Sequence, residues 1–213
     1  MSRHHPSPDV LIAYAAGSLP EPHALVIATH LSLCPECRAT AAELDALGGA
    51  MLDELSPTLL EPDALDRLMA RFDEPAPPVA PPLPADPVLP APLRAYVGRS
   101  IEGIVWKKLG FGIEEFRLPI PDTERYTARL VLVAAGREIP SHGHDGDEVT
   151  LVLAGGFTDG SDNYRRGDVS GADPTVSHRP VADADGECIC LIVTEGKLRF
   201  SGLFGPLLSY FRG

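Results

Sequence analysis

Apolar and polar residues in the first third of the chain recur with the period of a helix. Ser7-Pro8-Asp9 combines an N-cap, a first-turn proline and an acid, and Gly17 is a typical stop, so a short helix is predicted over about 8–16. Three more helices are predicted over about 20–31, 35–55 and 62–72. The last has an apolar face, which either completes a bundle with the others or docks on a partner.

After residue 92 the pattern changes to short runs of β-branched and aromatic residues, separated by Gly, Pro and Asp turns. The runs predicted as strands are Trp106 to Leu109, Glu114 to Leu118, Thr127 to Ala134, Glu148 to Leu153, Asp168 to Ser170 and Cys188 to Thr194. Many short strands with Gly-rich turns indicate an antiparallel barrel or sandwich.

Between the two patterns, nine of the eighteen residues from 75 to 92 are proline. Such a segment forms neither a regular helix nor a central strand, and we expect a semi-rigid spacer that lets the two halves move relative to each other. The sequence therefore predicts an α+β chain of two domains, with a small helical bundle over 1–74, a linker over 75–92 and an antiparallel β-barrel or sandwich over 93–213.

A set of metal-ligand residues lies at the end of the second predicted helix. His30 and Cys34 are four residues apart, so on a helix both side chains leave the same face. Cys37 follows after a Cys-x-x-Cys step that brings its sulfur to the same point. A structural zinc ion takes four nitrogen or sulfur ligands. We predict His5 as the fourth, ahead of His4, because it lies closer to the first helix.

The Cys-x-x-Cys step has two other interpretations, a redox motif or a pair of unrelated core cysteines. A thioredoxin-type redox motif lies between a strand and a helix. Everything around Cys34 and Cys37 is predicted to be helical, which favours zinc.

A second set of ligands lies among the predicted strands. His142 and His144 are two residues apart on extended backbone, so both imidazoles point to one face, and Glu148 follows four residues later. The spacing Gly136-x5-His142-x-His144-x3-Glu148-x6-Gly155 matches the first cupin motif at every position.

His178 lies where the second cupin motif has its histidine, ten residues after Gly167-Asp168. The second motif departs from its usual form, because Thr175 replaces a glycine and no asparagine follows. Three imidazoles and a carboxylate can hold zinc, iron, manganese or nickel, so ligand chemistry alone leaves the metal open.

The two motifs together resemble a known family. His-x3-Cys-x2-Cys after an N-terminal histidine, in an acidic helical region, resembles the zinc-binding anti-sigma domain, and the whole chain resembles the ChrR family of anti-sigma factors, in which a cupin follows that domain. The resemblance implies zinc at both sites, structural at the first and regulatory or structural at the second, with no catalytic residues. It also implies a 1:1 complex with an extracytoplasmic-function sigma factor, released in response to singlet oxygen or related oxidants.

The charge of the chain is consistent with a protein partner. The formal charge is −12, and the first 74 residues carry twelve acidic residues against four basic ones. An acidic surface repels nucleic acid and suits a basic protein partner. Without a signal-peptide pattern or an apolar run long enough to span a bilayer, the chain is expected to be cytoplasmic. Four cysteines in such a chain indicate metal or thiol chemistry.

Cys188 and Cys190 alternate on a predicted strand, so both thiols point to one face. Core packing is the commoner role of such residues. The alternative is that a thiol near the second metal takes part in sensing.

An enzyme is the alternative function. Three histidines and a glutamate also form the metal site of many cupin dioxygenases and isomerases, which need an open coordination position and a substrate pocket. A catalytic domain has no evident need for a zinc-binding helical unit, and this favours a regulator.

Overall fold

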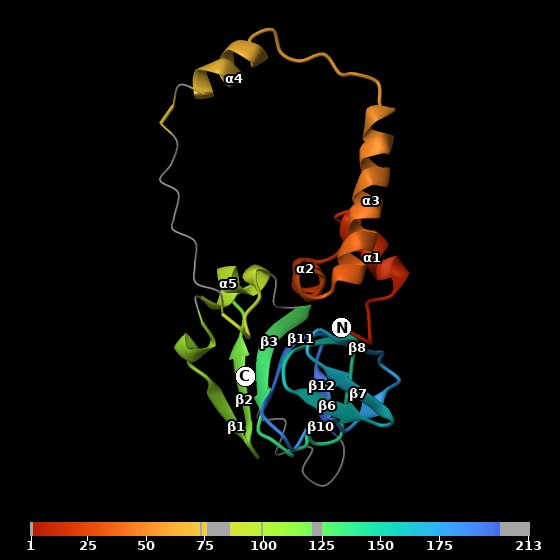
Figure 1. Ribbon diagram of the computed structural model, residues 1–213, viewed down its shortest axis with the longest axis vertical. Helices are drawn as coiled ribbons and strands as arrows, with labels where there is room; N and C mark the ends of the chain where they lie inside the picture. Colours follow the sequence, from red (N-terminus) through yellow and green to blue (C-terminus); the bar gives the residue numbers. More distant parts are fainter. Residues whose placement is uncertain (1, 73, 76–85, 99, 121–124, 201–213) are drawn as a thin grey trace.

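The computed structural model describes residues 2–72, 74–75, 86–98, 100–120 and 125–200 (Figure 1). Its helices are α1 (Pro8–Ala15), α2 (Glu21–Leu33), α3 (Pro35–Asp53), α4 (Ala64–Phe72), α5 (Ala91–Val97) and a 3-10 turn, η1 (Ile101–Gly103). The four helices predicted from the sequence are all present. Gly17, just after α1, has a φ of 65°, a left-handed conformation that glycine adopts without strain and that ends the helix.

The strands follow the last helices. They are β1 (Lys107–Gly110), β2 (Ile113–Arg117), β3 (Tyr126–Val133), β4 (His142–His144), β5 (Glu148–Ala154), β6 (Gly156–Asp159), β7 (Asp162–Arg165), β8 (Val169–Ala172), β9 (Ser177–His178), β10 (Val181–Ala182), β11 (Cys188–Glu195) and β12 (Leu198–Phe200). All six predicted strands are found at nearly the predicted positions, and β4, β6, β7, β9, β10 and β12 are additional.

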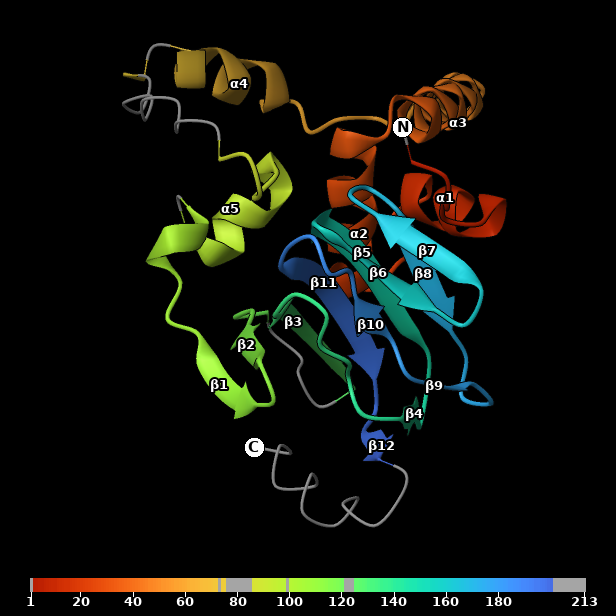
Figure 2. The ribbon, with the colours of Figure 1, turned by 60° about the horizontal axis from the view of Figure 1, so that its bottom comes forward.

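The strands form three antiparallel sheets (Figure 2). A six-stranded sheet has the order β1-β2-β3-β11-β5-β8, and two three-stranded sheets have the orders β10-β6-β7 and β12-β4-β9. Because the strands divide among separate sheets, the fold is a sandwich rather than one closed barrel. The α+β class and the antiparallel second half are thus confirmed.

The six-stranded sheet has two apolar faces. The inner face, toward the small sheets, includes Val131, Val152 and Cys190. The outer face includes Leu130 and Leu191, and helix α2 packs on it. A strand whose residues are buried on both faces has an almost continuous apolar run, as β11 does.

Leu25 and Val26 of α2 belong to the core of the outer sheet face, and both are buried. The structure therefore differs from the expectation of two halves that move relative to each other. The physical reason is that α2 is apolar on all sides, and such a helix is stable when it is covered on all sides. We call residues 2–72 the helical part and residues 86–200 the sheet part.

The described end of the proline-rich segment belongs to the sheet part. Leu89 and Leu93 are fully buried in the outer core. The carboxylate of Asp86 accepts hydrogen bonds from the backbone N–H groups of Leu89 at 2.7 Å and Ile101 at 3.0 Å. These contacts fix the place where the chain enters the sheet part.

Helix α4 does not complete a bundle. Figure 1 shows α3 extending away from the sheets and α4 lying at the far end of the molecule. Every residue of α4 is exposed or half-buried. The bundle alternative is therefore wrong, and the docking alternative remains.

No helix in the described part of the chain combines the length and the apolar character that a bilayer crossing needs.

Candidate metal centres

The first cluster brings together His5, His30, Cys34 and Cys37, which we call the His/Cys cluster. One ligand atom from each lies within 4.8 Å of those of the other three. The His5 Nδ1 atom is 3.5 Å from the sulfur of Cys34 and 3.2 Å from that of Cys37. The structure places His4 elsewhere, with its ring 4.4 Å from that of Tyr164.

Local structure explains how the cluster forms. His30 lies in the last turn of α2, Cys34 is the residue between α2 and α3, and Cys37 lies in the first turn of α3. The Cys37 N–H donates to the sulfur of Cys34 at 3.5 Å, so Cys34 is the N-cap of α3. His5 arrives from the segment before α1.

The donor atoms of this cluster fit a metal ion. The Gly167 carbonyl, which can only accept, lies 2.8 Å from His30 Nδ1, so that nitrogen carries the proton. His30 Nε2 is then a lone-pair donor, buried without a hydrogen-bond partner in the described residues. Burial lowers the pKa of His30, which keeps its imidazole neutral.

The sulfur atoms are buried too. Burial, together with the neighbouring Cys34 thiol, raises the pKa of the Cys37 thiol to about 12. A buried thiolate without a cation is therefore unfavourable here, whereas zinc binds thiolates directly. Two thiols and two imidazoles form a common donor set for structural zinc.

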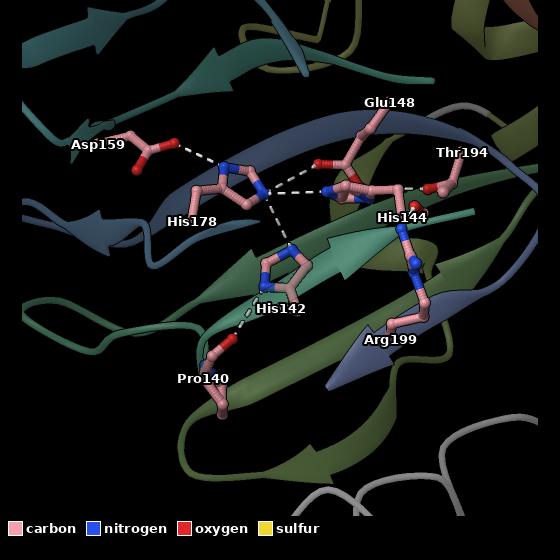
Figure 3. Close-up of polar contacts among 8 residues, drawn as sticks. All are labelled: Pro140, His142, His144, Glu148, Asp159, His178, Thr194 and Arg199. Atoms are coloured by element: carbon pink, nitrogen blue, oxygen red, sulfur yellow. Dashed lines mark hydrogen bonds and ion pairs between the residues drawn. The ribbon is translucent and has the colours of Figure 1, made fainter. Parts of the chain in front are cut away.

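The second cluster brings together His142, His144, Glu148 and His178, which we call the His/Glu cluster. Their ligand atoms also lie within 4.8 Å of one another. Figure 3 shows the three imidazoles pointing toward one another, with Glu148 beside them. Strand β4 supplies two histidines, β5 begins with Glu148, and β9 pairs with β4 so that His178 lies opposite His142.

The ring protons of this cluster are held on its outside. The Pro140 carbonyl lies 2.8 Å from His142 Nδ1, and the Asp159 carboxylate lies 2.6 Å from His178 Nδ1. Both partners are acceptors, so each Nδ1 carries a proton and each Nε2 is left with a lone pair. These two Nε2 atoms lie 3.1 Å apart. Two facing lone pairs fit a cation between them.

Burial disfavours the charged forms of three members of this cluster. It lowers the pKa of His142 to about 4 and also lowers that of His144. It raises the pKa of Glu148, whose carboxylate accepts a hydrogen bond from Thr194 at 3.2 Å. A divalent ion would supply the positive charge that these buried donors lack.

Several contributing residues were missed from sequence. Asp159 and Pro140 orient the histidines of the second cluster, and Gly167 orients His30 of the first. Nothing in the sequence around Asp159 or Pro140 indicates that these residues orient a histidine. Only Gly167 had a signal, since the cupin spacing counts His178 from it.

A cavity of about 120 Å³ adjoins the His/Glu cluster. Its wall includes His142, Glu148 and His178, and apolar side chains form most of the remainder. Cys188 and Cys190 also line it as free, buried thiols, with their sulfur atoms 3.5 Å apart. Their predicted position on one strand face agrees with this arrangement.

The fold and the two clusters define a class of protein in which a helical unit with a His/Cys cluster is docked on a cupin with a His/Glu cluster. Residues 9–38 match a putative zinc-finger family, and residues 97–198 match the ChrR cupin-like domain family.

The anti-sigma-E factor ChrR of Cereibacter sphaeroides is 45% identical over 209 residues, which cover 98% of this chain and 97% of that protein. A crystal structure of Rhodobacter sphaeroides SigE in complex with the anti-sigma ChrR contains a similar chain, with a TM-score of 0.81 and 44% identity, covering 91% of this chain and all of that one. The chain belongs to the ChrR family of anti-sigma factors. These comparisons do not favour the dioxygenase or isomerase alternative.

Proposed function

We propose that this chain binds an extracytoplasmic-function sigma factor in a 1:1 complex and keeps it from directing transcription. Membership in the ChrR family supports the proposal, as does the similarity to a chain seen in a complex with SigE. The observation that carries it in this structure is an apolar surface on the helices that extend away from the sheets.

This apolar surface lies on the second half of α3, the segment after it, and α4. Its large side chains are all exposed, namely Leu47, Met51, Leu52, Leu55, Leu59, Leu60, Leu65, Leu68, Met69 and Phe72. Figure 1 shows the far end of α3 and the whole of α4 lying away from the sheets. Exposed apolar surface of this extent marks a protein interaction site.

Helix α4 has the pattern of a helix that docks in a groove. Leu65, Leu68 and Phe72 lie at positions i, i+3 and i+7, so they form one face. Phe72 is 75% exposed. The acidic charge of the first 74 residues suits a partner with a basic surface.

Zinc at the His/Cys cluster would be structural in this proposal. Ligands from the segment before α1, from α2 and from α3 would fix where α3 starts and hence where its exposed face points. Zinc at the His/Glu cluster would be regulatory or structural rather than catalytic.

Each domain expected from the sequence has its own role in this proposal. Residues 1–74 would hold the sigma factor, residues 75–92 would be the linker, and residues 93–213 would be the cupin that responds to singlet oxygen or related oxidants in the cytoplasm. Release requires a signalled state with a lower affinity for the sigma factor.

Co-expression with the cognate extracytoplasmic-function sigma factor tests the proposal. We expect a complex with the mass of one copy of each chain, and loss of transcription from a promoter that depends on this sigma factor when the chain is added to polymerase. Separate elution of the two chains and unchanged transcription would overturn it.

A further inference from the structure

The turn between β7 and β8, residues 166–168, touches the His/Cys cluster although it belongs to the sheet part. Backbone hydrogen bonds hold it to the middle of β5. The Gly167 N–H donates to the Val152 carbonyl at 2.8 Å, and the Val152 N–H donates to the Asp168 carbonyl at 3.1 Å. Strand β5 also begins with Glu148. The position of the turn is therefore set by the strand that carries a ligand of the other cluster.

The first contact of this turn is with His30. As described above, the Gly167 carbonyl accepts from Nδ1 of His30 and leaves Nε2 directed at the cluster. Hydrogen bonds of this kind fix the tautomer and the orientation of metal-bound histidines. Gly167 has a φ of 89°, and an added Cβ would lie 2.7 Å from the Ser2 hydroxyl oxygen. The positive φ favours glycine at this position, and any larger residue would also displace the Ser2 hydroxyl.

The second contact is with the segment that leads to His5. Asp168 is 1% exposed, and one of its carboxylate oxygens accepts from the backbone N–H groups of Arg3 and His4, the latter at 3.1 Å. The Val169 N–H donates to the His4 carbonyl at 3.0 Å. Residues 3 and 4 are thus tied to the start of β8, and the next residue along is His5.

Two members of the His/Cys cluster are therefore positioned by the sheet part, and the two cysteines by the junction of α2 and α3. All four members lie in the helical part, but the His30 ring and the backbone next to His5 are held by contacts with the sheet part. We infer that the Gly167 carbonyl and the Asp168 carboxylate form the outer hydrogen-bond shell of the His/Cys cluster, so that the sheet part sets its zinc affinity.

This inference rests on the proposed zinc at that cluster and adds the route by which the cupin acts on it. Because coupling between two binding events is reciprocal, zinc at the His/Cys cluster also strengthens the docking of the N-terminal segment on β8. A change in the cupin that shifts the turn would weaken zinc binding in the helical part without contact with the sigma factor.

Asp168→Asn in the full chain tests the inference. The matched control is Asp162→Asn, the same change at an exposed site in β7, the strand that leads into this turn. Cobalt(II) is the probe, because its bond to a thiolate gives a charge-transfer band that a His/Glu site lacks. Competition of zinc against cobalt at that band reports the affinity of the His/Cys cluster alone.

We expect Asp168→Asn to weaken zinc binding about 10- to 100-fold, as loss of an outer-shell partner does, and Asp162→Asn to leave it unchanged. Equal affinity in the two variants would overturn the inference. A wild-type chain without the thiolate band would overturn the proposed zinc site and, with it, the inference.

A second measurement leaves the turn intact. In a Cys37→Ala chain, which removes a ligand from the other side of the cluster, we expect faster hydrogen exchange at the Val169 N–H than in the zinc-loaded wild type. Unchanged exchange at this amide would show that the cluster and the turn are independent, and would overturn the inference even if Asp168→Asn misfolds.

Discussion

The hydroxyl group of Tyr96 donates a hydrogen bond to a carboxylate oxygen of Glu21 at 2.7 Å, although 75 residues separate the two in the chain. Glu21 begins α2 and Tyr96 lies in α5, so the bond joins the two parts of the molecule at the edge of a contact whose centre is apolar. The apolar centre should dominate the stability of docking, because a single peripheral hydrogen bond contributes little in net terms.

We expect Leu25→Ala to lower the free energy of unfolding by about 2–5 kcal/mol, since Leu25 is buried in the shared core. Tyr96→Phe, which removes only the peripheral hydrogen bond, should cost about 1 kcal/mol. Urea denaturation followed by tryptophan fluorescence measures both. A larger effect of Tyr96→Phe than of Leu25→Ala would contradict this account of docking.

The proposed sigma-binding surface predicts the effect of a charge on α4. Phe72→Asp should weaken the complex by about 2 kcal/mol or more, roughly 30-fold, because large aromatic anchors dominate interfaces. Val105→Asp is the control, as Val105 is 87% exposed but lies in the sheet part. Affinity is measured by titration with the purified sigma factor. Equal affinities of the two variants would place the interface elsewhere.

Removing a cysteine should reduce the zinc content only if that cysteine belongs to the His/Cys cluster. Cys37→Ala removes a ligand from the His/Cys cluster, so elemental analysis should find about one zinc fewer per chain than in the wild type. The sigma factor should no longer bind. Cys190→Ala, a buried cysteine outside both clusters, should keep the full zinc content. Full sigma affinity in a zinc-depleted Cys37→Ala chain would show that this zinc is dispensable.

Zinc affinity at the His/Cys cluster should rise with pH between about 6.5 and 8. The pKa of the Cys37 thiol is raised to about 12, so zinc must displace its proton. His30, whose pKa is lowered by burial, is already neutral and releases none. Each proton displaced makes the affinity about tenfold higher per pH unit. Chelator competition at several pH values measures the slope, and a flat profile would mean that the thiols do not bind as thiolates.

Asp159 should control metal binding at the His/Glu cluster. Asp159→Asn removes the carboxylate that holds the proton on His178 Nδ1, and we expect the metal affinity of this cluster to fall about 10- to 100-fold. Asp162→Asn, its neighbour across the β6–β7 hairpin, is the control. The thiolate–cobalt band of the His/Cys cluster should persist in both variants. Its loss in Asp159→Asn would indicate that the whole chain had misfolded.

Features that depend on neighbouring residues could be predicted from the sequence. Helix starts and stops depend on a few adjacent residues, as the Pro8 start and the Gly17 stop illustrate. His142 and His144 share a strand face for the same local reason, and Glu148 and His178, which the cupin spacing indicated, lie beside them. Spacing grouped the second set of four and three members of the first, whereas His5 was chosen because it lies closer than His4 to the first helix.

Features that depend on contacts distant in the chain could not be predicted in this way. Asp168 and Arg3 are 165 residues apart, and nothing near either residue indicates that they meet. One signal was overlooked. Helix α2 lacks a polar face, since Val26 packs on the sheet while Ile27 packs beside the cysteines of the His/Cys cluster. A helix of this kind predicts cover on both sides, and hence contact between the two parts.

The chain leaves the docked core along α3, passes through α4 and returns at α5, where it contacts α2 again (Figure 1). A protease that cut the exposed segment between α3 and α4 would therefore produce two fragments that stay together, joined by the Leu25 and Val26 contacts and by the N-terminal segment on β8. Cleavage and separation are distinct events in such an architecture. A cut in this segment would fall within the proposed sigma-binding surface, yet the fragment that carries α3 would stay attached to the sheet part until the contacts of α2 also came apart.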